Sequence, residues 1–128
     1  MDKKPFVTLE QLREIERTYP TPFYLYDEKG IRENAARLKQ AFSWNKGYKE
    51  YFAVKATPNP FLLNILKDMG CGTDCSSMTE LMMSRACGFS GSDIMFSSND
   101  TPPEEFAYAK KLGAIINLDD ITHIQCLE

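Results

Sequence analysis

A lysine at the end of an apolar run is the residue of this sequence best placed for covalent chemistry. Lys55 directly follows the run at residues 51–54 and precedes Ala-Thr-Pro. An amine at the end of an apolar strand is partly desolvated, and desolvation lowers the pKa of an amine and makes it more nucleophilic, as imine formation requires. An ordinary surface lysine at the exit of a strand has the same pattern, so the residue type leaves both interpretations open.

Two acidic side chains follow Lys55 along the chain. Asp74 lies 19 residues later, near the end of the next apolar run. There it could hold the lysine amine and tune its charge, or cap the following helix. Glu80 forms an S-x-x-E pattern with Ser77, which is typical of a capping box at a helix start. The capping box explains Glu80 fully, and a place in the site is its second interpretation.

Ser98 and Asn99 stand at the end of a third apolar run. They could direct small hydrogen-bonding groups toward the same site, or form the turn before a helix capped at Thr101. In parallel α/β folds the active site lies at the carboxyl ends of the strands. All of these positions are therefore candidates.

The elements that must position these residues recur with a regular period. Four apolar runs begin 21, 22 and 21 residues apart, at residues 50–54, 71–75, 93–97 and 114–118. The segments between them have helical periodicity, which predicts helices over residues 60–69, 77–87 and 101–112. Alternating strands and helices predict a parallel sheet with right-handed crossovers. An open doubly wound sheet and a closed barrel both fit, and the regular period favours the barrel.

The remaining segments predict an incomplete barrel. Residues 23–26 are expected to form a strand, Asp27 to cap a helix, and Asp119 or Asp120 to begin a helix that the chain does not finish. A (β/α)8 barrel needs eight units and about 250 residues. The expected fold class is α/β, the N-terminal half of a (β/α)8 TIM-type barrel truncated before closure. We expect an N-terminal segment with a short helix at residues 1–22 and the partial barrel at residues 23–128.

Composition excludes several functional classes. The chain has 43% hydrophobic residues, enough for one core, and 15 basic against 18 acidic residues give a formal net charge of -3. Because there is no basic stripe to neutralise phosphates, we expect no nucleic-acid partner. The start of the chain lacks the apolar segment of a signal peptide, and no run is long enough to span a membrane. We therefore expect a cytoplasmic protein with no membrane partner.

The cysteines predict free thiols rather than a metal site. The spacing of Cys71, Cys75, Cys87 and Cys126 matches no zinc ribbon or finger, and His123 is the single histidine. Buried free thiols are the preferred interpretation. We expect a surface histidine at position 123 and a core thiol at position 126.

At these residues the sequence resembles a known family. The matching motifs are T-P-F-Y-L-Y-D at 21–27, Y-F-A-V-K-A at 51–56, G-T-D-C-S-S-x-x-E-L at 72–81, F-S-S-N at 96–99 and, more loosely, I-N-L-D at 116–119. In this order and spacing they resemble the N-terminal part of the bacterial diaminopimelate decarboxylases, pyridoxal-phosphate enzymes of the alanine-racemase-like fold. The resemblance covers residues 21 to about 120.

The resemblance implies a (β/α)8 barrel followed by a C-terminal β domain, working as a homodimer. It implies that Lys55 carries pyridoxal 5'-phosphate as an imine and that Asp74 and Glu80 border the cofactor pocket. Ser98 and Asn99 are carried over as rim residues that bind the cofactor. The implied reaction is decarboxylation of a small-molecule amino acid, meso-2,6-diaminopimelate, to L-lysine and CO2.

Two alternatives stay open at this point. One is another pyridoxal-phosphate decarboxylase, acting on ornithine, arginine or carboxynorspermidine. The other is a non-catalytic half-barrel that binds a partner or the cofactor. The family's ring-stacking histidine, glycine-rich phosphate loop, ring-nitrogen acid and partner-subunit cysteine belong further downstream, so we do not expect the 128 residues to be active alone.

Overall fold

The computed structural model describes residues 4–127. Within them the helices are α1 (Leu9–Thr18), α2 (Glu28–Ala41), α3 (Pro60–Asp68), α4 (Met78–Ala86) and α5 (Pro103–Leu112). The strands are β1 (Tyr51–Ala53), β2 (Gly72–Cys75), β3 (Ile94–Ser98) and β4 (Ile115–Leu118). Short 3₁₀ turns occupy Val54–Ala56, Gly91–Asp93 and Ile121–Cys126.

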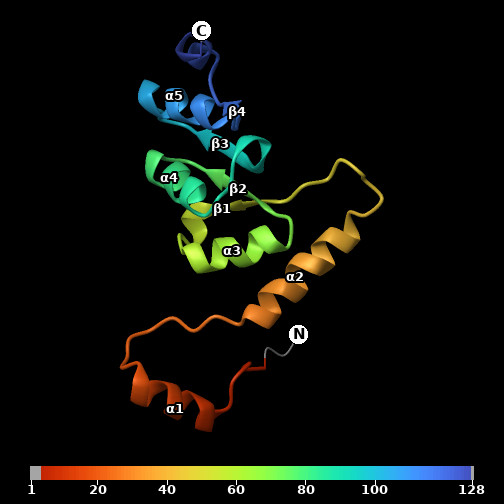
Figure 1. The fold of residues 1–128 in the computed structure, drawn as a ribbon, viewed down its shortest axis with the longest axis vertical. Helices are drawn as coiled ribbons and strands as arrows, with labels where there is room; N and C mark the ends of the chain where they lie inside the picture. The colour runs from red at the N-terminus through yellow and green to blue at the C-terminus, as the bar shows by residue number, and fades with distance from the viewer. Residues whose placement is uncertain (1–3, 128) are drawn as a thin grey trace.

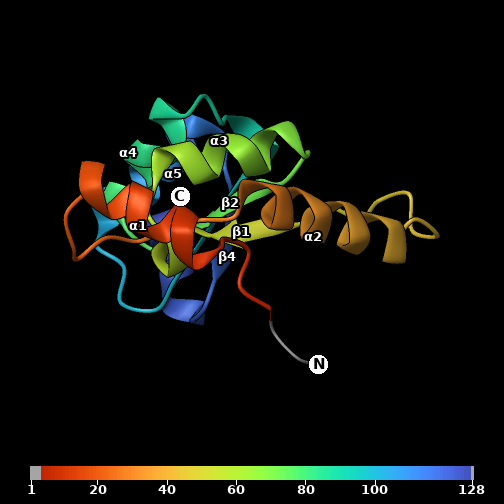
Figure 2. The same cartoon turned by 90° about the horizontal axis from the view of Figure 1, so that it is seen from below.

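The strands form one parallel sheet in the order β1-β2-β3-β4, with a helix between each consecutive pair (Figure 1). The crossover helices α3, α4 and α5 lie on one side of the strands (Figure 2). Right-handed crossovers produce this arrangement when each new strand is added on the same side of the last one. In the described residues the strand order does not reverse, as it would in a doubly wound sheet. The predicted parallel α/β architecture is therefore confirmed.

The hydrophobic core lies between the sheet and its crossover helices. The alternation of side chains along β3 shows this, because Ile94, Phe96 and Ser98 are buried whereas Met95 and Ser97 are only half-buried. The ring of Phe96 meets that of Phe106 from α5 edge to face, with centroids 5.8 Å apart. Each strand thus has one face covered by helices and one open face.

Local signals explain where the helices begin. The side chain of Asn59 accepts a hydrogen bond from the backbone N–H of Phe61, and Pro60 opens α3. The expected cap at Thr101 is wrong, since α5 begins at Pro103 with no side-chain cap. Two consecutive prolines displace the start, because Pro102 is extended and Pro103 takes the first helical position.

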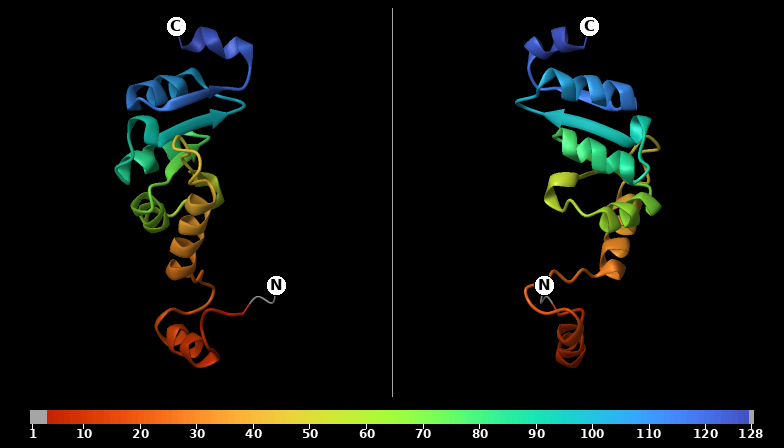
Figure 3. Two further views of the ribbon diagram at one scale, coloured as in Figure 1. Left: turned by 90° about the vertical axis from the view of Figure 1, so that its right-hand side faces the viewer. Right: turned by 60° about the vertical axis from the view of Figure 1, so that its left-hand side comes forward.

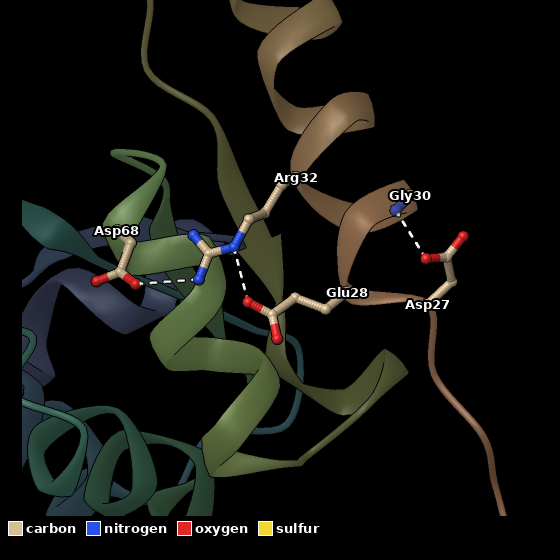
Figure 4. Close-up of polar contacts among 5 residues, drawn as sticks. All are labelled: Asp27, Glu28, Gly30, Arg32 and Asp68. Atoms are coloured by element: carbon tan, nitrogen blue, oxygen red, sulfur yellow. Dashed lines mark hydrogen bonds and ion pairs between the residues drawn. The ribbon is translucent and has the colours of Figure 1, made fainter.

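An ion pair connects α2 to the crossover helix α3. The Asp27 carboxylate accepts a 3.0 Å hydrogen bond from the Gly30 N–H, as expected for the cap of α2. Arg32 donates from Nε to Glu28 at 2.8 Å and from Nη2 to Asp68 of α3 at 3.4 Å (Figure 4). The bond to Asp68 joins α2 to α3, and the bond to Glu28 orients the Arg32 guanidinium.

The N-terminal part departs from the expectation. Residues 23–26 form no strand, because no described strand lies beside them to accept and donate the backbone hydrogen bonds. Helix α1 is present with a capping box at Thr8, but none of its residues is buried and it lies apart from the sheet (Figure 3).

The C-terminal expectations are met only in part. Asp120 caps a 3₁₀ turn rather than an α-helix, with its carboxylate accepting from the N–H of Thr122. His123 is not a surface residue, since its half-buried ring packs on Phe106 with centroids 5.4 Å apart. The side chain of Cys126 lies outside the described part of the structure.

The described thiols at positions 71, 75 and 87 are free. Cys75 is buried, and burial raises the pKa of its thiol to about 11. Among residues 4–127 no helix is long and apolar enough to cross a membrane, and no group of three metal-ligating side chains gathers.

Candidate functional site

Lys55 lies at the carboxyl edge of the sheet, immediately beyond β1. The strand ends at Ala53, and Val54 turns into a 3₁₀ turn with its side chain buried. This turn carries Lys55 past the strand end, so its side chain is exposed. The expectation of a desolvated amine is therefore not met within the described residues, although the expected position at the strand end is confirmed.

Asp74 is placed beside the end of β1 by the strand register. It pairs with Ala53, two residues before Lys55. Its neighbours Thr73 and Cys75 are buried against the helices, so alternation directs Asp74 to the open face. The alternative that Asp74 caps the next helix is wrong, because Ser77 caps α4.

The electrostatic environment of Asp74 is unusual for a surface carboxylate. One oxygen, Oδ1, is buried and has no hydrogen-bond partner in the described residues. Burial raises the pKa of the Asp74 carboxyl, the charge of Lys55 lowers it, and the charge of Glu80 raises it again. The carboxylate thus lies within electrostatic reach of the lysine amine and keeps one oxygen available for a further donor.

Glu80 fixes the loop between β2 and α4. Its carboxylate accepts hydrogen bonds from the Ser76 N–H at 2.8 Å and from the Ser76 Oγ at 3.1 Å. The Ser77 hydroxyl accepts from the Glu80 N–H at 3.4 Å. Of the predicted capping box, the bond from the Glu80 N–H to the Ser77 hydroxyl is present. The reciprocal bond from the Ser77 N–H to the Glu80 carboxylate is absent, because the carboxylate bonds to Ser76, one residue before the cap. Glu80 therefore holds the loop that follows Asp74.

The structure does not place Ser98 on the face that carries Asp74. Asp74 pairs with Met95, and Ser98 lies three positions further along β3, which directs its side chain to the helix-covered face. Ser98 is accordingly buried, at 8% exposure. Asn99 follows the strand and is exposed. Thus β3 does not bring Ser98 together with Lys55 and Asp74.

Two polar residues on the correct face were missed by the sequence analysis. Ser97 lies two positions after Met95 and so shares the open face with Asp74, and it pairs with Asn117 of β4. The Asn117 Nδ2 donates a 3.2 Å hydrogen bond to the Ser97 Oγ. Counting in steps of two from Asp74 across the predicted register would have identified them.

A cavity of about 410 Å³ lies elsewhere, between α2, α3 and β1. Its walls are largely apolar and include Leu38, Phe52, Leu62 and Leu66. None of the predicted site residues lines it. The chemistry-bearing side chains instead follow the strand ends and the open face, where an amine and a carboxylate could bind a carbonyl compound and control its protonation.

Comparison with known proteins identifies the family. Residues 28–128 match the family described as "Pyridoxal-dependent decarboxylase, pyridoxal binding domain". The chain is 44% identical over 109 residues to Protein TabA of Pseudomonas amygdali pv. tabaci, covering 85% of this chain and 26% of that protein. It is 37% identical over 112 residues to diaminopimelate decarboxylase of Bacteroides thetaiotaomicron, covering 87% of this chain and 29% of the relative.

A solved structure agrees with these matches. Diaminopimelate decarboxylase from Helicobacter pylori, complexed with L-lysine, superposes with a TM-score of 0.81 at 31% identity and covers 91% of this chain and 30% of that one. The chain thus spans less than a third of the length of each of these three proteins. With the family model covering all but the first 27 residues, the chain belongs to the pyridoxal-dependent decarboxylases and matches their pyridoxal binding domain.

Proposed function

We propose that this chain provides the cofactor-bearing part of a decarboxylase that converts meso-2,6-diaminopimelate to L-lysine and CO2. One observation carries the proposal. In a pyridoxal-dependent decarboxylase sequence, Lys55 lies at the carboxyl edge of a parallel sheet and Asp74, with one buried and unpartnered oxygen, lies within its electrostatic reach. This is the edge at which parallel α/β enzymes bind their substrates.

The proposed architecture is a (β/α)8 barrel of which residues 23–128 supply the first strands, preceded by a segment at residues 1–22. It is supported by the sequential strand order and by the crossover helices lying on one side of the sheet. Closure requires further strands beside β1 and β4, whose outer edges have no partner in the described residues. We extend the proposal to a cytoplasmic homodimer for the full-length protein.

The described residues fit the cofactor. Lys55 would bind it covalently through its exposed amine. The unpartnered Oδ1 of Asp74 and the hydroxyl and amide groups of Ser97 and Asn117 leave polar atoms on the open face available to it. When bound, pyridoxal phosphate supplies an aldehyde for the substrate amine and a ring that accepts the electron pair left by CO2.

The side chains of this chain then have separate tasks. Asp74 would orient the Lys55 side chain through the attraction between their charges. Glu80 positions the end of β2 through its two hydrogen bonds to Ser76 and so keeps Asp74 aligned. Asn99 remains a predicted rim residue on the loop after β3.

The substrate is inferred from relatives. The Bacteroides and Helicobacter proteins are named diaminopimelate decarboxylases, at 37% and 31% identity. Decarboxylation of another basic amino acid is the second candidate, because Protein TabA is more similar, at 44%, and its name states no substrate.

The test is release of CO2 by the full-length protein, loaded with pyridoxal phosphate, from meso-diaminopimelate, ornithine, arginine and carboxynorspermidine in parallel. We expect turnover of meso-diaminopimelate with L-lysine as product, and none in the Lys55→Ala variant. Preferential turnover of another amino acid would replace the substrate, and absence of turnover with every substrate would remove the enzymatic proposal.

A further inference from the structure

We propose that Ser97 and Asn117 form a polar rung on the open face of the sheet that contacts the bound pyridoxal group and positions it over the strand ends. The inference rests on the proposed function, because it concerns the same site. It adds two cofactor-contact residues on β3 and β4 to the lysine that follows β1 and the aspartate on β2.

The strand register places the rung. Ala53, Asp74, Met95 and Ile115 are successive partners across the four strands and share the open face. Ser97 and Asn117 pair with each other one side-chain row closer to the carboxyl edge. Lys55 follows Ala53 in the 3₁₀ turn beyond β1. The rung and the lysine therefore lie at the same carboxyl edge of the sheet.

The hydrogen-bonding capacity of the rung is only partly used. Asn117 donates from Nδ2 to the Ser97 Oγ at 3.2 Å. This bond fixes the carboxamide while leaving its second N–H, its Oδ1 and the Ser97 hydroxyl proton available. No other hydrogen bond to either side chain is present in the part of the chain that the structure describes. The pair can thus both donate to and accept from the polar substituents of a pyridine ring.

The residue types also point to a ligand. Open faces of barrel strands are normally filled by branched apolar side chains, as Ile115 begins to do on β4. Asparagine is depleted in strands, and serine packs little area there. Neither residue contributes to the helix-covered core, which is built from the other face of β3 and β4. Ser97 and Asn117 thus extend the polar part of this face from Asp74 toward the carboxyl edge, where a polar ligand would be bound.

The test is the affinity of the full-length apoprotein for pyridoxal phosphate, measured by titration of its visible absorption, with urea unfolding of each apoprotein alongside. We expect Asn117→Ala and Ser97→Ala each to raise Kd about three- to tenfold, the loss typical of one net hydrogen bond. Unfolding of the apoprotein should be little changed, because Asn117 is exposed, Ser97 is half-buried and neither side chain belongs to the hydrophobic core. Matched controls are Ser98→Ala, on the opposite face of the same strand, and Asn64→Ala, exposed on α3, and both should leave Kd at the wild-type value.

The outcomes separate this inference from the proposed function. If Ser97→Ala and Asn117→Ala bind the cofactor as tightly as the wild-type protein does, the proposed contact between the rung and the cofactor is refuted, and the proposed function is unaffected. The rung is also wrong if Ser98→Ala weakens binding as much as Ser97→Ala. If Asn117→Ala fails to fold, Ser97→Ala alone decides. Failure of the wild-type protein to bind the cofactor would instead remove the proposed function.

Discussion

Glu80 offers a sharp test of how the site is held together. Replacing it by alanine removes both hydrogen bonds to Ser76, at 2.8 and 3.1 Å, and a negative charge in the first turn of α4. Hydrogen bonds to a charged group contribute about 1.5–3 kcal/mol each when buried. Because Glu80 and Ser76 are only half-buried, water replaces part of this. We expect Glu80→Ala to lower the free energy of unfolding by about 2 kcal/mol.

The Glu80→Gln variant separates the contribution of the hydrogen bonds at residue 80 from that of its negative charge. The carboxamide can still accept from the Ser76 N–H and donate to its Oγ, so we expect a loss of about 1 kcal/mol or less. The assay is urea unfolding of the full-length apoprotein followed by circular dichroism. Glu104→Ala is the matched control, because it removes an exposed first-turn carboxylate from α5 that has no hydrogen bond in the described residues. Equal losses in Glu80→Ala and Glu104→Ala would refute the positioning role.

Three further predictions concern stability. Burial raises the folded-state pKa of the Asp74 carboxyl above the ordinary value of 3.8. The wild-type apoprotein should therefore lose unfolding free energy relative to Asp74→Asn as the pH rises from 3.8 to that folded-state pKa. A difference in unfolding free energy that does not change with pH would contradict this. Phe106→Ala, at a residue 1% exposed against Phe96, should cost about 3–5 kcal/mol in urea unfolding, and a cost below about 1 kcal/mol would show that this ring is not core. Gly72→Ala would place a Cβ 2.6 Å from the Asp93 carbonyl oxygen, so we expect a loss of about 1–3 kcal/mol, and an unchanged melting temperature would contradict that close approach.

The periodic part of the fold was predictable from the sequence because it depends on local signals. Each of the four strands expected from the period is present within one residue at either end, and the 21-residue period corresponds to one strand and one crossover helix. Glycine at residue 113 and the caps at Asn59 and Ser77 mark helix ends by short-range chemistry. The strand predicted at residues 23–26 is absent because a strand needs a neighbouring strand to pair with, and the β propensity of a segment does not supply one.

The sequence predicted which residues lie at the strand ends, but not which face of the sheet each side chain lies on. Lys55 and Asp74 could be located because the ends of adjacent parallel strands meet at one edge. Ser98 and Ser97 are identical in type and adjacent in sequence, so only the register, which fixes which residue faces Asp74, distinguishes them. Glu80 required knowledge of the loop geometry, because its carboxylate bypasses the helix cap and bonds to Ser76.

Lys55 can be tested directly by borohydride reduction of the full-length protein in the presence of pyridoxal phosphate, followed by peptide mass spectrometry. We expect one modified lysine, Lys55, and loss of the modification in Lys55→Arg. The matched control Lys46→Arg, at another exposed lysine, should leave it intact. Modification of a different lysine, or persistence of the label in Lys55→Arg, would contradict the assignment of Lys55 as the cofactor-bearing residue.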